Sequence, residues 1–180
     1  MHDSICSLRA GKEELSMRRI KLVFFWMLFL GFTVAGCGAV GPLDNGEEFY
    51  LIVPIPPGIS YEISGDFYTP QPGGPTDSGL HEGIDYDVPE GTPIIASAPG
   101  VVIEAGELGA TGKRVLIQHT NNFRTNYGHL GSIQVANNQE VSRGQRIGFS
   151  GNIPGFQGNP HIHFGLYRDS QAIDPQPYFR

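Results

Sequence analysis

The stretch Arg114-Val115-Leu116-Ile117-Gln118-His119 is a short segment with an apolar centre, and a second candidate strand, Thr125 to His129, follows beyond Asn121 and Asn122. Short segments of this kind, bounded by Gly, Pro or Asn, are typical of β-strands. They recur along most of the chain, and we expect strands at 49–53, 84–88, 93–97, 101–105, 114–119, 125–129, 133–135, 146–149 and 162–167. No segment shows a sustained helical period. The sequence therefore predicts an all-β, antiparallel domain over residues 49–180.

The composition limits the classes of function. The chain has 180 residues, with 25 Gly, 14 Pro and 17% charged residues, which suits one β-rich domain and a targeting segment. The formal net charge of −6 argues against a nucleic-acid partner, because phosphate binding needs an excess of Lys and Arg. Without its first 36 residues the chain has 7 basic and 15 acidic residues. Binding to any anionic polymer would thus require a shaped site.

The N-terminus has the pattern of a targeting segment. The basic group Arg18-Arg19-Ile20-Lys21 precedes the apolar run Leu22 to Val34, as in a signal peptide. About 20 apolar residues are needed to span a bilayer, so a permanent membrane helix is the weaker alternative. We expect residues 1–36 to be removed. Met17 lies directly before the basic group and is a candidate for the true start of translation.

The apolar run ends in Val34-Ala35-Gly36-Cys37, which resembles the lipobox of bacterial lipoproteins, where the cysteine is lipidated. The resemblance implies a lipidated Cys37, a tether over residues 37–48, and a membrane-anchored protein in the cell envelope. Gly38 is not the Asp that resembles an inner-membrane retention signal, so in a Gram-negative host we expect the outer membrane. The other cysteine, Cys6, is lost with the signal segment. Any metal in the mature domain must therefore be held by His and carboxylate groups.

Histidines carry the chemical signal of the chain. Five of the six lie beyond the signal segment, and four of these are in the compact motifs His81-Glu82-Gly83-Ile84-Asp85, Tyr127-Gly128-His129-Leu130 and His161-Ile162-His163-Phe164. On a strand His161 and His163 would share a face about 6.6 Å apart. One could bind a metal while the other takes a proton from a nearby water. The alternative for such a pair is two surface histidines on an alternating strand.

His81 and Asp85 would lie about 13 Å apart on a straight strand, too far for one ion. Gly83 lies between them and can supply the bend that lets both side chains converge. Two histidines and one carboxylate leave an open fourth position, which a catalytic zinc requires. The remaining histidines could then act as general base and as donor to an oxyanion. His119 has no part in these motifs, and we expect it at the surface or next to a ligand.

The order and spacing of these motifs resemble the LytM/lysostaphin family of zinc peptidases, over about residues 80–167. The resemblance implies that His81, Asp85 and His163 bind one Zn²⁺ and that His129 and His161 are catalytic. It also implies a compact antiparallel β-sandwich or barrel-like fold of the duplicated hybrid-motif type.

The activity implied by the resemblance is hydrolysis of peptide bonds in peptidoglycan stem peptides or cross-bridges. The alternative is a catalytically silent relative that activates cell-wall amidases as a partner. Gly165 departs from the pattern, since a Glu often follows the final motif there. We expect the loops 69–79 and 152–160 to form the walls of the active site.

Overall fold

The computed structural model describes residues 48–70, 79–107, 109, 112–152 and 159–180. The signal segment, the lipobox and most of the two expected wall loops lie outside these residues. Among the described residues, none belongs to a helix with the length and apolarity that a membrane span needs.

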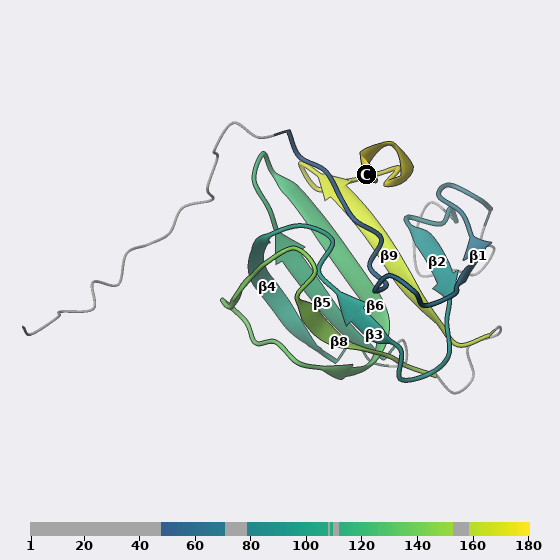
Figure 1. Ribbon diagram of the computed structural model, residues 1–180. Coiled ribbons are helices and arrows are strands. Elements are labelled where there is room, and N and C mark those ends of the chain that lie inside the picture. The colour runs from purple at the N-terminus through teal and green to yellow at the C-terminus, as the bar shows by residue number, and fades with distance from the viewer. Residues whose placement is uncertain (1–47, 71–78, 108, 110–111, 153–158) are drawn as a thin grey trace, which may run out of the picture. The chain divides into compact units, whose positions relative to one another are not determined.

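The described residues form β-strands and a short 3₁₀ helix, η2 (Gln176–Tyr178), and every strand pairing is antiparallel. The strands are β1 (Glu62–Gly65), β2 (Ile84–Asp87), β3 (Pro93–Ile95), β4 (Gly100–Glu107), β5 (Lys113–Gln118), β6 (Phe123–Ile133), β7 (Glu140–Val141), β8 (Arg146–Ser150), β9 (His161–Arg168) and β10 (Gln171–Ile173) (Figure 1). The all-β antiparallel class predicted from the sequence is confirmed.

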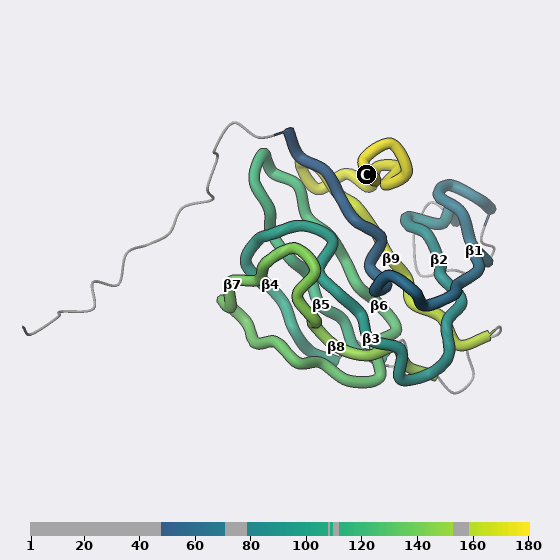
Figure 2. Tube along the Cα trace, in the orientation of Figure 1, coloured from purple at the N-terminus to yellow at the C-terminus, as the bar shows by residue number. Residues whose placement is uncertain are grey.

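The strands form one sheet in the order β1-β2-β9-β6-β5-β4-β7, with β10 beside β9 and β8 joining β3 to β6. The trace of β6 runs between β9 and β5 (Figure 2). β6 is long enough to pair with β5 and β9 along its first part and with β8 near its end. The sequence motifs that lie far apart in the chain therefore meet on β2, β9 and β6.

Side-chain alternation gives the sheet two faces with different characters. Tyr127 pairs with Phe164, and both are completely buried, as are Ile84 and Leu166 on the same face. We call this the core face. Gly128 pairs with His163, which in turn pairs with Asp85, so these residues lie on the opposite face. We call that face the metal face.

The expectation of a strand at residues 49–53 is wrong. Leu51 forms only an isolated bridge to Phe179. Its backbone also forms two hydrogen bonds with the residues on either side of Phe179. These bonds run from Leu51 N to Tyr178 O (2.8 Å) and from Arg180 N to Leu51 O (3.0 Å). Leu51 is fully buried, so this segment covers the core without joining the sheet. Residues 133–135 are likewise not a separate strand, because β6 ends at Ile133.

Candidate metal centre

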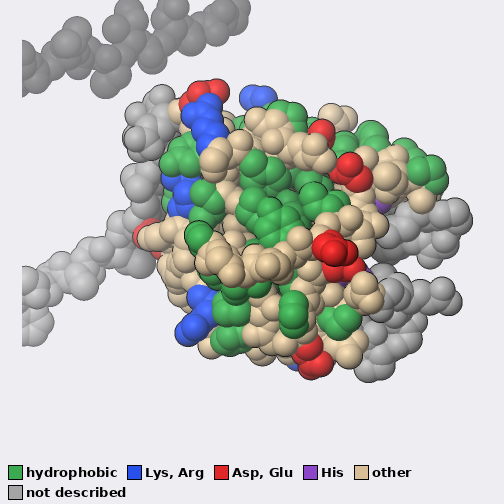
Figure 3. All heavy atoms as spheres, turned by 45° about the vertical axis from the view of Figure 1, so that its right-hand side comes forward, with side chains coloured by type: hydrophobic (Ala, Val, Ile, Leu, Met, Phe, Trp, Pro, Cys, Tyr) green, Lys and Arg blue, Asp and Glu red, His purple; other side chains and the backbone are tan. Residues whose placement is uncertain are grey.

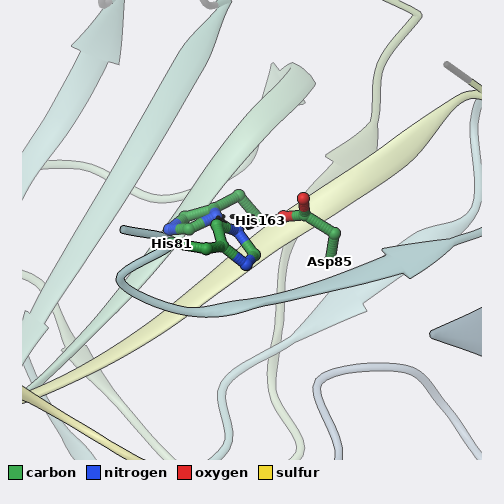
Figure 4. A group of neighbouring side chains, drawn as sticks. All are labelled: His81, Asp85 and His163. Atoms are coloured by element: carbon green, nitrogen blue, oxygen red, sulfur yellow. Dashed lines mark hydrogen bonds and ion pairs between the residues drawn. The ribbon is translucent and has the colours of Figure 1, made fainter. Parts of the chain in front are cut away.

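The structure brings His81, Asp85 and His163 together as predicted (Figure 4). The distances are 3.1 Å from His81 Nε2 to Asp85 Oδ1, 3.0 Å from His81 Nε2 to His163 Nδ1, and 3.0 Å from His163 Nδ1 to Asp85 Oδ1. The three donor atoms thus form a nearly equilateral triangle. Donors bound to zinc in a tetrahedron at about 2.0–2.1 Å lie about 3.3 Å apart. The donor set and its spacing fit a zinc ion.

The elements around the triangle explain how the residues meet. Asp85 on β2 pairs directly with His163 on β9, so their side chains are neighbours on the metal face. His81 precedes β2, and the chain bends at Gly83 as expected from the sequence. Its backbone is fixed by hydrogen bonds from Tyr68 N to His81 O (2.7 Å) and from His81 N to Thr69 O (3.0 Å).

A backbone carbonyl sets the tautomer of His81. Nδ1 of His81 lies 3.0 Å from the carbonyl oxygen of Asp66, which can only accept a hydrogen bond. Nδ1 therefore carries the proton, and in the neutral ring Nε2 keeps the lone pair that a metal needs. This contact has no signal in the sequence, because the group that makes it is the backbone of Asp66.

The charges of the triangle stabilise one another. Burial opposes ionisation of Asp85, but the hydrogen bonds from His163 and His81 outweigh it, so the pKa of Asp85 lies well below its usual value. Burial likewise opposes charging of His81, yet the hydrogen bond and the charge of Asp85 raise its pKa. The exposed fraction of the side chain is 3% for His81, 12% for Asp85 and 18% for His163. The site is therefore enclosed and retains a carboxylate at neutral pH.

Two further histidines lie beside the triangle. The ring of His129 is 6.0 Å from that of His163 and 4.9 Å from that of His161, measured between centroids. The rings of His81 and His163 are also 4.9 Å apart. Four histidine rings thus form one continuous row. The five residues singled out in the sequence lie in a single site.

His129 reaches this row because β6 contains a bulge. Two residues of β6, Gly128 and His129, stand opposite the single residue Arg114 between the pairs Val115↔Tyr127 and Lys113↔Leu130. His129 has a φ of 60°, a left-handed conformation that is unfavourable for a residue with a Cβ. Regular alternation would have placed His129 on the core face. The bulge turns it toward His161 and lets Leu130 enter the core.

His161 is held through its neighbour on the chain. Its Nδ1 donates to the carbonyl oxygen of Asn159 at 2.8 Å, so in the neutral ring Nε2 carries the lone pair. The Asn159 side chain donates to Asp87 Oδ2 at 2.9 Å, and Asp87 pairs with His161 across β2 and β9. Ser64 Oγ donates to the other oxygen of Asp87. Asp87 and Asn159 are positioning residues that sequence reasoning missed.

His119 is neither at the surface nor next to a ligand, which corrects the sequence expectation. It is 3% exposed and lies on the core face, where Nδ1 donates to the Pro99 carbonyl at 2.7 Å. Nε2 accepts from Thr125 Oγ1 at 2.7 Å, and the Thr125 hydroxyl lies 3.1 Å from that of Tyr127. Burial lowers the pKa of His119 to about 4, so the ring is neutral. It is a structural histidine.

Comparison with known proteins agrees with this geometry. Residues 79–175 match the peptidase family M23. The chain belongs to this family. All five residues of the site fall inside the matched region.

Two curated relatives and one solved structure illustrate the similarity. The peptidoglycan DD-endopeptidase ShyA of Vibrio cholerae is 46% identical over 86 residues, which cover 48% of this chain and 20% of ShyA. The lipoprotein YgeR of Escherichia coli is 35% identical over 104 residues, covering 57% of this chain and 41% of YgeR. A crystal structure of a zinc-containing peptidase from Vibrio cholerae matches with a TM-score of 0.62 and 29% identity, over 72% of this chain and 40% of that one. The match thus spans less than half of each of these proteins.

Proposed function

We propose that this member of the M23 family is a zinc-dependent endopeptidase that hydrolyses peptide bonds in peptidoglycan stem peptides or cross-bridges. The observation that carries the proposal is the triangle of His81 Nε2, Asp85 Oδ1 and His163 Nδ1, with the rings of His129 and His161 alongside it. The similarity to a peptidoglycan DD-endopeptidase supports the choice of substrate class.

His81, Asp85 and His163 would hold the zinc ion. When bound, zinc supplies Lewis acidity to the scissile carbonyl and to the attacking water. The protein supplies the remaining chemistry. The carboxylate of Asp85 neutralises part of the metal's charge, and the Asp66 carbonyl keeps Nε2 of His81 available as a ligand atom.

We assign proton transfer to His161. Its Nδ1–H is held by the carbonyl of Asn159, so Nε2 is the basic nitrogen, and His161 lies on the same side of β9 as His163. His129, 4.9 Å from His161 between ring centroids, is placed to donate an N–H to the oxygen that becomes negative during attack. Because the two histidines have different roles, substitution of either should strongly lower the rate of hydrolysis.

The experiment is digestion of purified sacculi by the zinc-loaded, detergent-solubilised protein, with the products identified by mass spectrometry. We expect loss of cross-linked muropeptides, abolished by chelator and by His163→Ala. His119→Gln is the matched control, because it changes a histidine on the core face of the same sheet. If zinc binds but no wall type yields new products, the proposal fails. The regulator of cell-wall amidases then becomes the better assignment, and it is tested by adding an amidase.

The same proposal includes the location of the enzyme. We propose that residues 1–36 contain a signal peptide whose true start is Met17, and that Cys37 is lipidated. A tether over 37–48 and the peptidase domain over 49–180 follow. The similarity to the lipoprotein YgeR supports an envelope lipoprotein. Labelling with a radioactive fatty acid tests this, since Cys37→Ser should abolish incorporation. Label retained in that variant would exclude Cys37 as the anchor.

A further inference from the structure

Tyr167 lies on the metal face of β9, four residues beyond the metal ligand His163. The residue between them on this face is Gly165. A Cβ on Gly165 would lie 3.0 Å from Cε2 of Tyr167 and 3.4 Å from its hydroxyl oxygen. The tyrosine ring therefore leans back along the strand, over Gly165 and toward His163. The Gly165 departure from the family pattern is thus what makes room for Tyr167.

One buried polar atom at this place has no hydrogen-bond partner among the described residues. Asn126 on β6 pairs directly with Gly165 and is only 9% exposed. Its Oδ1 atom is buried without a hydrogen bond to any described residue. Tyr167 is only partly buried, and its ring lies beside Asn126 over Gly165. Because buried polar groups are normally hydrogen-bonded, the unmet oxygen of Asn126 points to a ligand at this place.

Arg124 adds a positive charge to the same place. It pairs directly with Tyr167 across β6 and β9. Its Nη2 donates to Ser170 Oγ at 2.7 Å, a neutral partner, and it forms no ion pair with another described residue. Arg114, the other arginine near the Tyr167 hydroxyl, is instead paired with Glu104. The cation available for a ligand is therefore Arg124.

The Tyr167 hydroxyl is a hydrogen-bond donor at neutral pH. Burial raises the pKa of Tyr167, and the negative charge of Glu82 acts in the same direction, against Arg114 and Arg124. Rotation of the Asn126 carboxamide about its terminal torsion can present its N–H₂ or its oxygen to a ligand, because such torsions have broad minima. The three side chains together offer a cation and several N–H and O–H donors.

We propose that Tyr167, Asn126 and Arg124 form a subsite that binds a carboxylate of the stem peptide, so that the substrate is held beside the metal centre. The inference rests on the proposed function for the identity of the substrate. Arg124 and the Tyr167 hydroxyl bind the carboxylate, and Asn126 bonds the adjacent peptide group. Four residues of strand correspond to about 13 Å, so the carboxylate lies within about four residues of the scissile bond. These are positioning residues that determine specificity.

The test measures binding rather than cleavage. The probes are a soluble stem tetrapeptide and the same peptide with every carboxylate converted to carboxamide. Binding is measured by calorimetry to the zinc-loaded, detergent-solubilised protein carrying His161→Ala, which blocks cleavage and keeps the three ligands. We expect the unmodified peptide to bind more tightly than the amide.

On that background, Tyr167→Phe keeps the ring over Gly165 and removes the hydroxyl. A hydrogen bond to a charged group contributes about 1.5–3 kcal/mol, so affinity for the unmodified peptide should fall at least tenfold. Affinity for the amide should fall by less, because a carboxamide oxygen still accepts a hydrogen bond but carries no charge. Arg124→Gln should act in the same way. Tyr61→Phe is the control, since Tyr61 is an exposed tyrosine whose ring packs on Tyr86 of the core face.

Equal affinity for the two peptides, or equal loss with both in Tyr167→Phe, would overturn the inference. Failure of the proposed function gives a different result. In that case the protein with His161 intact cuts no sacculi, whereas the preference for the carboxylate peptide is still measurable in the binding experiment. A carboxylate preference without cleavage would place the subsite in a binding protein.

Discussion

Gly83 and His163 lie so close that a Cβ on Gly83 would be 2.6 Å from Cε1 of the histidine ring. The same Cβ would also lie 2.6 Å from the carbonyl oxygen of Phe164. Gly83 is therefore needed for space as well as for the bend between His81 and Asp85. A second glycine, Gly65, has the same role on the other side, because its Cβ would lie 2.8 Å from Asp85 Oδ2. The candidate metal centre therefore packs against two residues that have no side chain, Gly65 and Gly83.

Gly83→Ala should therefore damage both the fold and the site. Overpacking of this kind costs about 1–3 kcal/mol of unfolding free energy. Displacing a ligand's surroundings typically lowers metal affinity about tenfold to hundredfold. Urea unfolding and zinc titration measure the two effects. Gly106→Ala is the matched control, because a Cβ on Gly106 meets nothing within 4 Å. Equal behaviour of the two variants would refute the close-packing argument.

Zinc removal should lower the thermal stability of the domain. A ligand that binds only the folded state at a hundredfold excess over its Kd contributes about 2.7 kcal/mol. We expect chelator to lower the Tm, and added zinc to restore it. Asp85→Asn and His81→Ala should abolish the zinc-dependent part of the Tm. His119→Gln should keep it, and a zinc response that survives Asp85→Asn would place the ion elsewhere.

Stability should also depend on pH through His119. The folded pKa of about 4 lies below the value of about 6.5 in the unfolded chain, so the unfolded state binds more protons between these values. The contribution of His119 is complete above pH 6.5 and decreases as the pH falls toward 4. A shift of this size corresponds to at most about 3 kcal/mol. Urea unfolding in chelator at pH 7 and pH 5 should show this loss.

The control for that experiment is His119→Gln, which removes the titrating group from the core. Its unfolding free energy should change less between the two pH values than that of the unaltered protein. An identical pH dependence in both proteins would assign the effect to other groups.

The left-handed backbone conformation of His129 predicts that glycine is more stable than alanine at this position, the reverse of the usual order in a strand. In an ordinary strand Ala is more stable than Gly by about 0.5–1 kcal/mol. At a φ of 60° the Cβ of alanine retains the strain of about 1–2 kcal/mol, which glycine relieves. His129→Gly should therefore be more stable than His129→Ala, by roughly 1 kcal/mol. Both should lose the peptidase activity proposed here, and the ordinary order would show that the bulge relaxes freely.

Most of the strand pattern could be predicted from the sequence, because half-buried and buried strands carry strong apolar signals. The expected strands at 84–88, 114–119 and 162–167 agree with β2, β5 and β9 within about a residue at each end. The sequence did not predict β1, β7 and β10, because strands of two to four residues are too short to show an alternating pattern. The five site residues could be found because their spacing is distinctive. Their supporting contacts could not, because the Asp66 and Asn159 carbonyls are backbone groups without a sequence signal.

The wrong prediction for His119 shows a second limit of interpreting the sequence. β5 ends at Gln118, and continued alternation puts His119 on the face of the buried Val115 and Ile117. What the sequence does not show is whether a histidine at this position can be buried. Buried partners decide it, since Pro99 and Thr125 satisfy both ring nitrogens. A histidine can be as buried as a leucine when each nitrogen is hydrogen-bonded.

The bulge at His129 bears on whether such a domain acts as an enzyme or only as a scaffold. In a protein that acts only as a scaffold or regulator, replacing this histidine with glycine would raise stability without loss of function. In this chain a histidine occupies the strained position, beside three residues that could hold a metal ion. Under the proposed function, the strained backbone at position 129 is the cost of bringing His129 to the site, a cost that a scaffold alone would not need.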